Sequence, residues 1–337
     1  MRFIDGLQVS AALSYPALVD ILDDAFRIGA ISPLRHHHRI SLERRPEAMM
    51  LLMPAWQASH EGALTAGPYI GIKLITMFPD NTTRLSKPGI QGIYLLLSSE
   101  SGEPLAVMDA PSLTVWRTAA ASALASRYLS RPDASHMVLA GAGALAEFLI
   151  QAHASVRPIT HVEIWNRTPA NAAKVAAKFA ASGLDVTVTS DLEAAVRRAD
   201  IVSTATISST PIVRGAWLKA GTHLDCVGAY RPDMRETDDD CVSRAKLWVD
   251  TRIGGLNEAG DIVMPLKAGV ITEAQVLGDL YGLSRGRGRA PLRTSPDDIT
   301  MFKSVGASIE DLAAAVAVWD TVRSGGDADD TGHEHER

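Results

Sequence analysis

A short apolar run in the middle of the chain ends in closely spaced glycines. Residues 138–146 read Val-Leu-Ala-Gly-Ala-Gly-Ala-Leu-Ala, a buried strand followed by the pattern G-x-G-x-x-A. Gly141 permits a tight turn, Gly143 lets a phosphate approach bare backbone, and Ala146 lets the next helix pack closely on the strand. The start of that helix favours a pyrophosphate. The turn therefore predicts a dinucleotide site with contacts from Gly141, Ala142, Gly143, Ala144 and Leu145.

Strands and helices alternate along the middle of the chain. The predicted strands are 137–140, 161–165, 185–189, 201–205, 223–227 and 247–249, and the predicted helices between the first four end near 154, 181 and 198. Alternation at this spacing is typical of a parallel sheet with helices on both faces. We therefore predict an α/β protein with a central Rossmann-type, doubly wound parallel sheet in residues 131–304.

The two ends of the chain have a different pattern. Apolar spacing predicts a helix over 12–28, and short apolar runs broken by Gly, Pro, Asn and Ser between 49 and 108 predict a small, mostly antiparallel sheet. An Ala-rich helix follows at 113–129, and a last helix is predicted at 309–322. We expect residues 1–130 and 305–323 to form a second, α+β domain, and residues 324–337 to form a disordered tail.

Composition excludes several classes of protein. Apolar residues make up 46% and charged residues 21% of the chain, which argues against a disordered or fibrous protein. The net charge of -6 and the lack of a basic stripe argue against nucleic-acid binding. No apolar run is long enough to span a membrane, the N-terminus lacks a signal-peptide pattern, and two cysteines are too few for a disulfide scaffold. We expect a soluble, cytoplasmic protein.

The end of the second predicted strand bears on the choice of cofactor. An acidic residue at this point would bind the ribose 2′-hydroxyl of NADH. Strand 161–165 instead ends in Asn166-Arg167-Thr168, and Glu163 lies inside the strand. These three side chains can bind a 2′-phosphate, so the sequence favours NADPH, with NADH as a weaker alternative.

Three cations outside the Rossmann segment have unusual surroundings. Lys73 interrupts an apolar strand, and Arg117 lies near the start of a helix, where the dipole disfavours it. Arg35 precedes the run His36-His37-His38. Each cation taken alone has an ordinary structural explanation, but together they suggest a pocket for a small carboxylate.

The three consecutive histidines could suggest a metal site. Adjacent residues of a strand point to opposite faces, so they cannot easily bind one ion. No H-x-x-x-H or C-x-x-C pattern occurs, and we predict no metal site. Cys226 and Cys241 fit buried side chains better than nucleophiles.

Several short motifs together resemble one family. They are Pro33-Leu34-Arg35, Met53-Pro54-Ala55, Gly71-Ile72-Lys73-Leu74, the block Leu-Thr-Val-Trp-Arg-Thr-Ala-Ala at 113–120, the glycine turn, residues 227–236 and residues 302–306. With these motifs the chain resembles the ornithine cyclodeaminase/mu-crystallin family over nearly its whole length. The resemblance implies a homodimer in which the α+β domain binds the substrate and forms the dimer contact.

The resemblance also assigns roles to residues. It places Lys73, Arg117 and Arg35 at the substrate carboxylate and the reacting group, with Arg39 as an alternative to Arg35. It places Thr118 near the cofactor phosphates and four residues near the nicotinamide. Those four are Val227, Gly228, Val305 and Gly306, and we add Ala205 and Thr206 at the end of strand 201–205 as further cofactor contacts.

One departure from the family pattern affects the predicted reaction. Tyr230 stands where the cyclodeaminases carry a catalytic aspartate, and Asp225 lies five residues earlier, inside a predicted strand. The chain looks more like the ketimine reductases of proline metabolism, which reduce Δ1-pyrroline-2-carboxylate or Δ1-piperideine-2-carboxylate to L-proline or L-pipecolate. Tyr230 either contacts the substrate or packs, and Lys73 either donates a proton or holds the carboxylate. The alternatives are an alanine dehydrogenase-like amino acid dehydrogenase, an ornithine cyclodeaminase and a non-catalytic ligand-binding protein like mu-crystallin.

Overall fold

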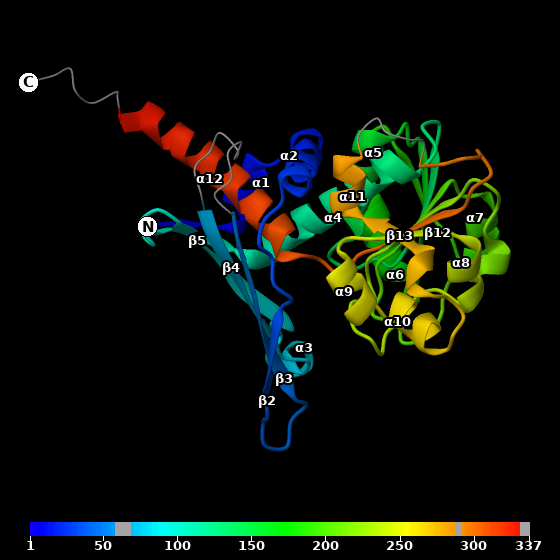
Figure 1. The fold of residues 1–337 in the computed structure, drawn as a ribbon, viewed down its shortest axis with the longest axis horizontal. Helices are drawn as coiled ribbons and strands as arrows, with labels where there is room; N and C mark the ends of the chain where they lie inside the picture. The colour runs from blue at the N-terminus through cyan, green and yellow to red at the C-terminus, as the bar shows by residue number, and fades with distance from the viewer. Residues whose placement is uncertain (58–68, 287–291, 331–337) are drawn as a thin grey trace, which may run out of the picture. The chain divides into compact units, whose positions relative to one another are not determined.

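The chain divides into two compact units. The computed structural model describes residues 1–57, 69–286 and 292–330. One unit contains residues 1–117 and the segment from 307 onward, and the other contains Thr118–Gly306. The first boundary lies inside helix α4 (Ala110–Leu129), and the second lies just before helix α12 (Ser308–Asp330) (Figure 1). The predicted boundary at 130/131 falls at the end of α4 instead.

The first unit contains a six-stranded mixed sheet. Its strands are β1 (Arg2–Ile4), β2 (His36–Ile40), β3 (Ala48–Trp56), β4 (Tyr69–Met77), β5 (Ile90–Ser98) and β6 (Pro104–Asp109). They lie in the order β1-β6-β5-β4-β3-β2, and every neighbouring pair is antiparallel except β1 with β6. The prediction of a small, mostly antiparallel sheet is confirmed, and the parallel N-terminal strand is an addition that no pattern indicated.

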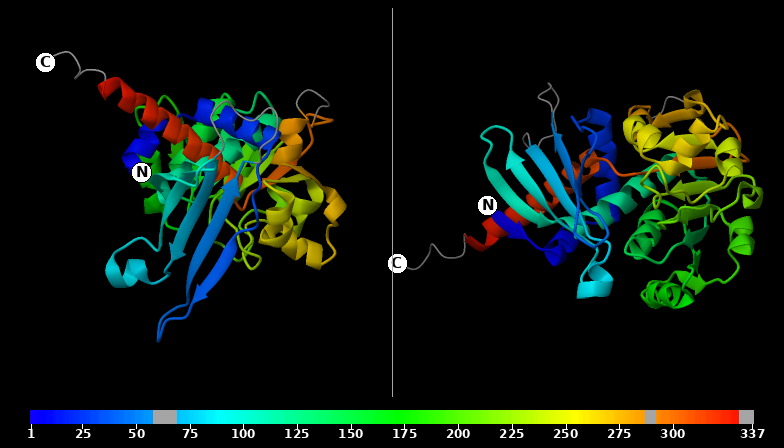
Figure 2. Two further views of the ribbon diagram at one scale, coloured as in Figure 1. Left: turned by 60° about the vertical axis from the view of Figure 1, so that its left-hand side comes forward. Right: turned by 90° about the horizontal axis from the view of Figure 1, so that it is seen from below.

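Helices from both chain ends pack in this unit. The helix predicted over 12–28 corresponds to α2 (Tyr15–Ile28), which begins three residues later, and a separate short helix, α1 (Gly6–Ala12), precedes it. Asp5 caps α1 by accepting from the Gln8 N–H, and the extended Leu13 ends it before α2 begins at Tyr15, with Pro16 in its first turn. Helix α12 packs on α2 and on strands β3, β4 and β5, as Figure 2 also shows. A short helix, α3 (Asn81–Leu85), follows β4.

Helix α12 is longer than the predicted 309–322, because no proline interrupts the sequence from 309 to 330. It extends through the first residues of the predicted tail, and the remaining residues 331–337 lie outside the described residues.

The second unit contains an eight-stranded parallel sheet. Its order is β13-β12-β14-β11-β10-β7-β8-β9, and every pair is parallel, which confirms the Rossmann-type prediction. Two of the strands, β13 and β14, were not predicted, and β14 inserts between β11 and β12. The strands are β7 (His136–Ala140), β8 (His161–Trp165), β9 (Asp185–Val188), β10 (Ile201–Thr204), β11 (His223–Cys226), β12 (Lys246–Val249), β13 (Val276–Asp279) and β14 (Thr300–Lys303).

Seven helices of this unit connect the described strands. Three correspond to predicted helices, α5 (Ala146–Val156), α6 (Pro169–Ala177) and α7 (Leu192–Arg198). Four short ones were not predicted, and three of them begin at a side-chain cap, Asp238, Thr251 or Asp279. They are α8 (Asp239–Arg244), α9 (Arg252–Asn257), α10 (Gly260–Lys267) and α11 (Leu280–Arg285). Among the described residues, no helix has the length and apolar character needed to cross a membrane.

Candidate active site

Lys73 points into the interior of the first unit. Strand β4 alternates between buried and half-buried residues, and Lys73 lies on the buried face with 2% of its surface exposed. Its Nζ donates to Asp311 Oδ1 at 2.8 Å and lies 3.4 Å from Thr114 Oγ1. A buried ammonium needs such partners, because its transfer out of water is otherwise costly.

Arg117 shares the same carboxylate. Its Nε donates to Asp311 Oδ1 at 2.8 Å, and its Nη1 donates to Glu310 Oε2 at 2.5 Å. Both acids lie in the first turn of α12, where the helix dipole favours negative charge. The four side chains form a buried ion cluster that joins β4, α4 and α12. Sequence reasoning found the two cations and missed the two acids, although Glu310-Asp311 at the start of a returning helix is a visible signal.

The cluster sets the protonation behaviour of Lys73. Burial, followed by the positive charge of Arg117, lowers the pKa of Lys73 to about 8, while Asp311 acts in the opposite direction. Burial also opposes the charge of Arg117, but Asp311 and Glu310 outweigh it and raise the pKa of that guanidinium. Lys73 can therefore gain and lose a proton near neutral pH, whereas Arg117 stays charged.

Tyr94 adds a hydroxyl group to this cluster. It is the cross-strand partner of Lys73 and is completely buried. Burial, followed by the charge of Asp311, raises the pKa of Tyr94 well above its usual value, so the phenol keeps its proton. Within the described part of the chain, neither its hydroxyl nor Asp311 Oδ2 has a hydrogen-bond partner. Gly71 leaves room for this ring, because a Cβ there would lie 1.8 Å from the hydroxyl.

The positions of Arg35 and Arg39 differ. Arg35 is half-buried, and its charge is one of the causes that lower the pKa of Lys73. Arg39 is exposed on β2 and lies 3.6 Å from Glu47. Of these two arginines, Arg35 is the one whose charge reaches Lys73.

The glycine turn of the second unit fits a dinucleotide. Gly141 has a φ of +121°, and a Cβ there would lie 2.6 Å from the Ala205 carbonyl oxygen, so only glycine suits this position. A Cβ on Gly143 would meet nothing within 4 Å, which leaves open space over the backbone for a ligand. The Ala142 N–H donates to Asn166 Oδ1 at 3.1 Å, which connects the turn to the end of β8.

Glu236 connects two further loops of the predicted cofactor site. Its carboxylate accepts from the Thr206 N–H at 2.6 Å, the Gly228 N–H at 2.9 Å and the Ala229 N–H at 3.1 Å. These loops follow β10, which is next to β7 in the sheet, and β11, which is next to β10. Lys303 lies 4.0 Å from Glu236 and compensates part of its buried charge. Glu236 belongs to a motif of the family resemblance, but its bonding pattern is visible only in the fold.

The other predicted site residues fall into distinct environments. Arg167 and Thr168 are exposed at the start of α6, and Glu163 is buried within β8, away from the strand tip. Tyr230 packs against the apolar core of the second unit. Thr118 is buried in α4.

Backbone hydrogen bonds hold the other predicted cofactor contacts. The Ala205 N–H donates to the Ala140 carbonyl, and the Val227 N–H donates to the Thr204 carbonyl. The N–H groups of Val305 and Gly306 both donate to Asp250 Oδ2.

Asp225 does not take the place of the missing aspartate. It is completely buried, and its Oδ2 accepts from Ser203 Oγ at 2.7 Å and lies 3.1 Å from His153 Nε2. A carboxylate enclosed in this way holds β10, β11 and α5 together and is not open to a substrate.

Comparison with known proteins agrees with this architecture. The model of the ornithine cyclodeaminase/mu-crystallin family matches residues 4–326. The Δ1-pyrroline-2-carboxylate reductase of Colwellia psychrerythraea is 36% identical over 321 residues, which cover 94% of this chain and 98% of the relative.

Two solved structures have the same fold. That of Thermococcus litoralis Δ1-pyrroline-2-carboxylate reductase with NADH and L-proline matches with a TM-score of 0.87 and 30% identity, over 97% of this chain and 98% of that chain. An archaeal alanine dehydrogenase dimer with bound NAD matches with a TM-score of 0.85 and 28% identity, over 97% of each chain.

The fold and the two groups of residues define a class of protein. A parallel sheet with an open glycine turn, together with an α+β unit that buries a lysine and an arginine, is typical of a dinucleotide-dependent oxidoreductase. The chain belongs to the ornithine cyclodeaminase/mu-crystallin family. Within it, the chain is an NAD(P)H-dependent enzyme of the imine-reductase type.

The ion cluster predicts how activity depends on pH. If Lys73 donates a proton, kcat/KM is high below its pKa of about 8 and falls as the pH rises through that value. The substitution Asp311→Asn removes a charge that stabilises the ammonium, so the alkaline limb of the kcat/KM profile should move about one unit toward lower pH. The control Asp320→Asn, further along α12, should leave the limb in place. A limb that stays fixed or moves upward in Asp311→Asn would contradict this role.

Proposed function

We propose that this enzyme reduces a cyclic imino acid, Δ1-pyrroline-2-carboxylate or Δ1-piperideine-2-carboxylate, to L-proline or L-pipecolate with NADPH. The observation that carries the proposal is the buried cluster of Lys73, Arg117 and Asp311. In it, Asp311 bonds both to the Arg117 guanidinium, which stays charged, and to Lys73, whose pKa is lowered. The substrate has an anionic carboxylate and a basic imine nitrogen, so it requires both kinds of group. The similarity to Δ1-pyrroline-2-carboxylate reductases supports the same substrate class.

Different residues of the first unit bind the substrate carboxylate and protonate the imine nitrogen. Arg117 and Arg35 attract the carboxylate and fix the orientation of the ring. Asp311 holds the Lys73 ammonium, which gives a proton to the imine nitrogen and so makes C2 more electrophilic. The bound cofactor supplies the hydride that C2 accepts. The product has gained one hydride at carbon and one proton at nitrogen, and Lys73 regains its proton from water.

Substitution of the two cations tests this proposal. Lys73→Met and Arg117→Ala should each lower kcat/KM for NADPH oxidation with either cyclic imino acid by about 10²–10⁴-fold, because general acid catalysis and carboxylate binding are removed. NADPH binding, followed by fluorescence titration, should persist in both. Lys87→Met changes an exposed lysine of the same unit and should leave kcat/KM unchanged. Full activity of Lys73→Met would remove this lysine from the reaction.

The same assay separates the other candidate reactions. The structural similarity to an archaeal alanine dehydrogenase makes reductive amination of a 2-oxo acid the second candidate. Pyruvate with ammonia should be reduced much more slowly than the preformed cyclic imines. Faster turnover of pyruvate would favour the dehydrogenase, ammonia release from L-ornithine would favour the cyclodeaminase, and no turnover of any of them would favour a binding protein.

The preference for NADPH rests on the end of β8. Arg167 is exposed there, and Thr168 is the N-cap of α6 but makes no side-chain capping bond, so its hydroxyl is available to a phosphate. Glu163 is occupied by Arg198 and His136 and does not reach a ribose at the strand tip. A guanidinium and a helix start together suit the 2′-phosphate of NADPH.

Measurement of KM for both cofactors tests this preference. Arg167→Ala should raise KM for NADPH at least about tenfold and change KM for NADH little, because only NADPH carries the second phosphate. Lys174→Ala, an exposed cation on α6, is the matched control. A wild-type enzyme that uses NADH with the lower KM would reject the preference.

We also propose that the enzyme is a homodimer that pairs through the open face of the six-stranded sheet. The face opposite Lys73 carries a cross-strand row of Pro54, Ile72, Leu95 and Val107, all half-buried, and the adjacent Ile93 is 44% exposed. A contiguous apolar row that stays accessible is typical of a protein–protein contact. The archaeal alanine dehydrogenase relative is a dimer, which supports the same assembly.

Light scattering after size-exclusion chromatography tests the dimer. Leu95→Glu should convert the dimer to a monomer, because it places a charge at the centre of the apolar row. Leu277→Glu, at an exposed leucine of the second unit, should leave the dimer intact. A wild-type monomer, or a Leu95→Glu dimer, would contradict the proposal.

A further inference from the structure

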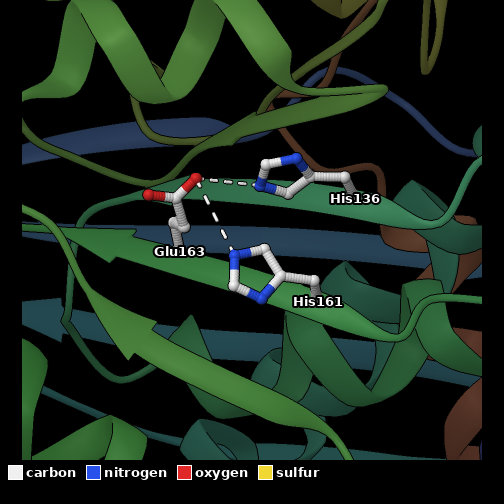
Figure 3. A group of neighbouring side chains, drawn as sticks. All are labelled: His136, His161 and Glu163. Carbon is white, nitrogen blue, oxygen red and sulfur yellow. Dashed lines mark hydrogen bonds and ion pairs between the residues drawn. The ribbon is translucent and has the colours of Figure 1, made fainter.

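Two histidines and a glutamate lie close together at the edge of the parallel sheet where strands β7 and β8 begin, away from the glycine turn. His136 and His161 are the first residues of β7 and β8 and are register partners. Glu163 lies two residues further along β8, so it shares a face of the strand with His161. Figure 3 shows the three side chains turned toward one another. The glycine turn follows the opposite end of β7, so this group is separate from the cofactor site.

The spacing of the donor atoms suits one metal ion. One nitrogen of each imidazole and one oxygen of Glu163 lie within 4.8 Å of one another. Glu163 Oε1 is 2.9 Å from His136 Nε2 and 4.0 Å from His161 Nε2. A tetrahedral Zn²⁺ with bonds of about 2.0–2.2 Å needs donors roughly 3.4 Å apart, a value between these two distances. Small side-chain rotations would therefore complete the site.

A second carboxylate orients one of the imidazoles. His161 Nδ1 lies 2.7 Å from Asp185 Oδ2. A carboxylate only accepts, so Nδ1 carries the proton, and in a neutral ring the lone pair of Nε2 then faces Glu163. Two electron-rich atoms face each other there, and a cation between them turns repulsion into attraction. A carboxylate behind a ligating imidazole is the usual outer partner of a bound zinc ion.

The charge state of the group is compatible with binding. Burial lowers the pKa of His136, so its ring is neutral at neutral pH, and metal binding at Nε2 needs only a shift of its proton to Nδ1. Arg198 is the competing cation, since its Nε donates to Glu163 Oε1 at 2.6 Å. The Arg198 side chain is 48% exposed and also donates to Glu163 Oε2. It can therefore release Oε1 to a metal ion and stay bonded to Oε2.

We propose that His136, His161 and Glu163 form a binding site for one Zn²⁺ ion, with Asp185 as the outer partner of His161. The ion would join the starts of β7 and β8 and leave a fourth position for water. Two nitrogen donors and one carboxylate oxygen favour zinc over magnesium or calcium, which prefer oxygen ligands only.

Zinc titration of the metal-free, full-length enzyme by calorimetry tests the site. The titration uses a background in which the other clustered histidines are replaced by alanine, namely His36, His37, His38, His333 and His335. This background should bind one equivalent of Zn²⁺, and His161→Ala should lose it. Asp185→Asn should weaken binding roughly 10–100-fold, as expected for an outer partner. Arg198→Met should tighten binding, because it removes the competing cation.

The Arg198→Met result is the strictest part of the test, because loss of binding in His161→Ala could reflect misfolding, whereas a gain of affinity could not. Anomalous diffraction at the zinc edge should place the ion between the two imidazoles. Absence of a bound equivalent in both the background and Arg198→Met, or equal binding by His161→Ala, would overturn the proposal.

Discussion

The buried ion cluster of Lys73, Arg117, Glu310 and Asp311 is the interaction on which the first unit depends. Two cations can be taken out of water only where acids meet them, and the acids come from the start of α12. The C-terminal helix must therefore pack on the N-terminal sheet. Removal of one partner from such a cluster costs about 3–5 kcal/mol, because the remaining charge stays buried without compensation.

The chemistry of these buried charges explains why an enzyme would keep them where apolar side chains could pack instead. Apolar residues in place of a buried ion cluster often give equal or greater stability, but they could neither attract a carboxylate nor supply a proton. The Tyr94 hydroxyl and Asp311 Oδ2, both buried without a partner in the described part of the chain, leave hydrogen-bonding capacity that a substrate can use. Perturbed groups of this kind concentrate where chemistry takes place.

In the second unit, the important contacts fix the conformation of the loops at the ends of the parallel strands. Gly141 fixes the turn after β7, and Glu236 fixes the loops after β10 and β11 with backbone hydrogen bonds. A buried carboxylate is costly, and Lys303 and the N–H donors offset that cost. The result is a rigid backbone in the position where a dinucleotide is expected.

The sequence alone determined the periodic parts of the fold and the identity of the cations. The alternation of apolar strands with helices located the parallel sheet. Lys73 stood out because it interrupts an apolar strand, and Arg117 because it lies near a predicted helix start. The packing of the folded chain was needed to show which acids pair with them, that β14 inserts between β11 and β12, and that His136 contacts Glu163. The physical reason is that periodicity records which face of an element is buried, whereas these contacts join residues far apart in the chain and depend on how elements pack.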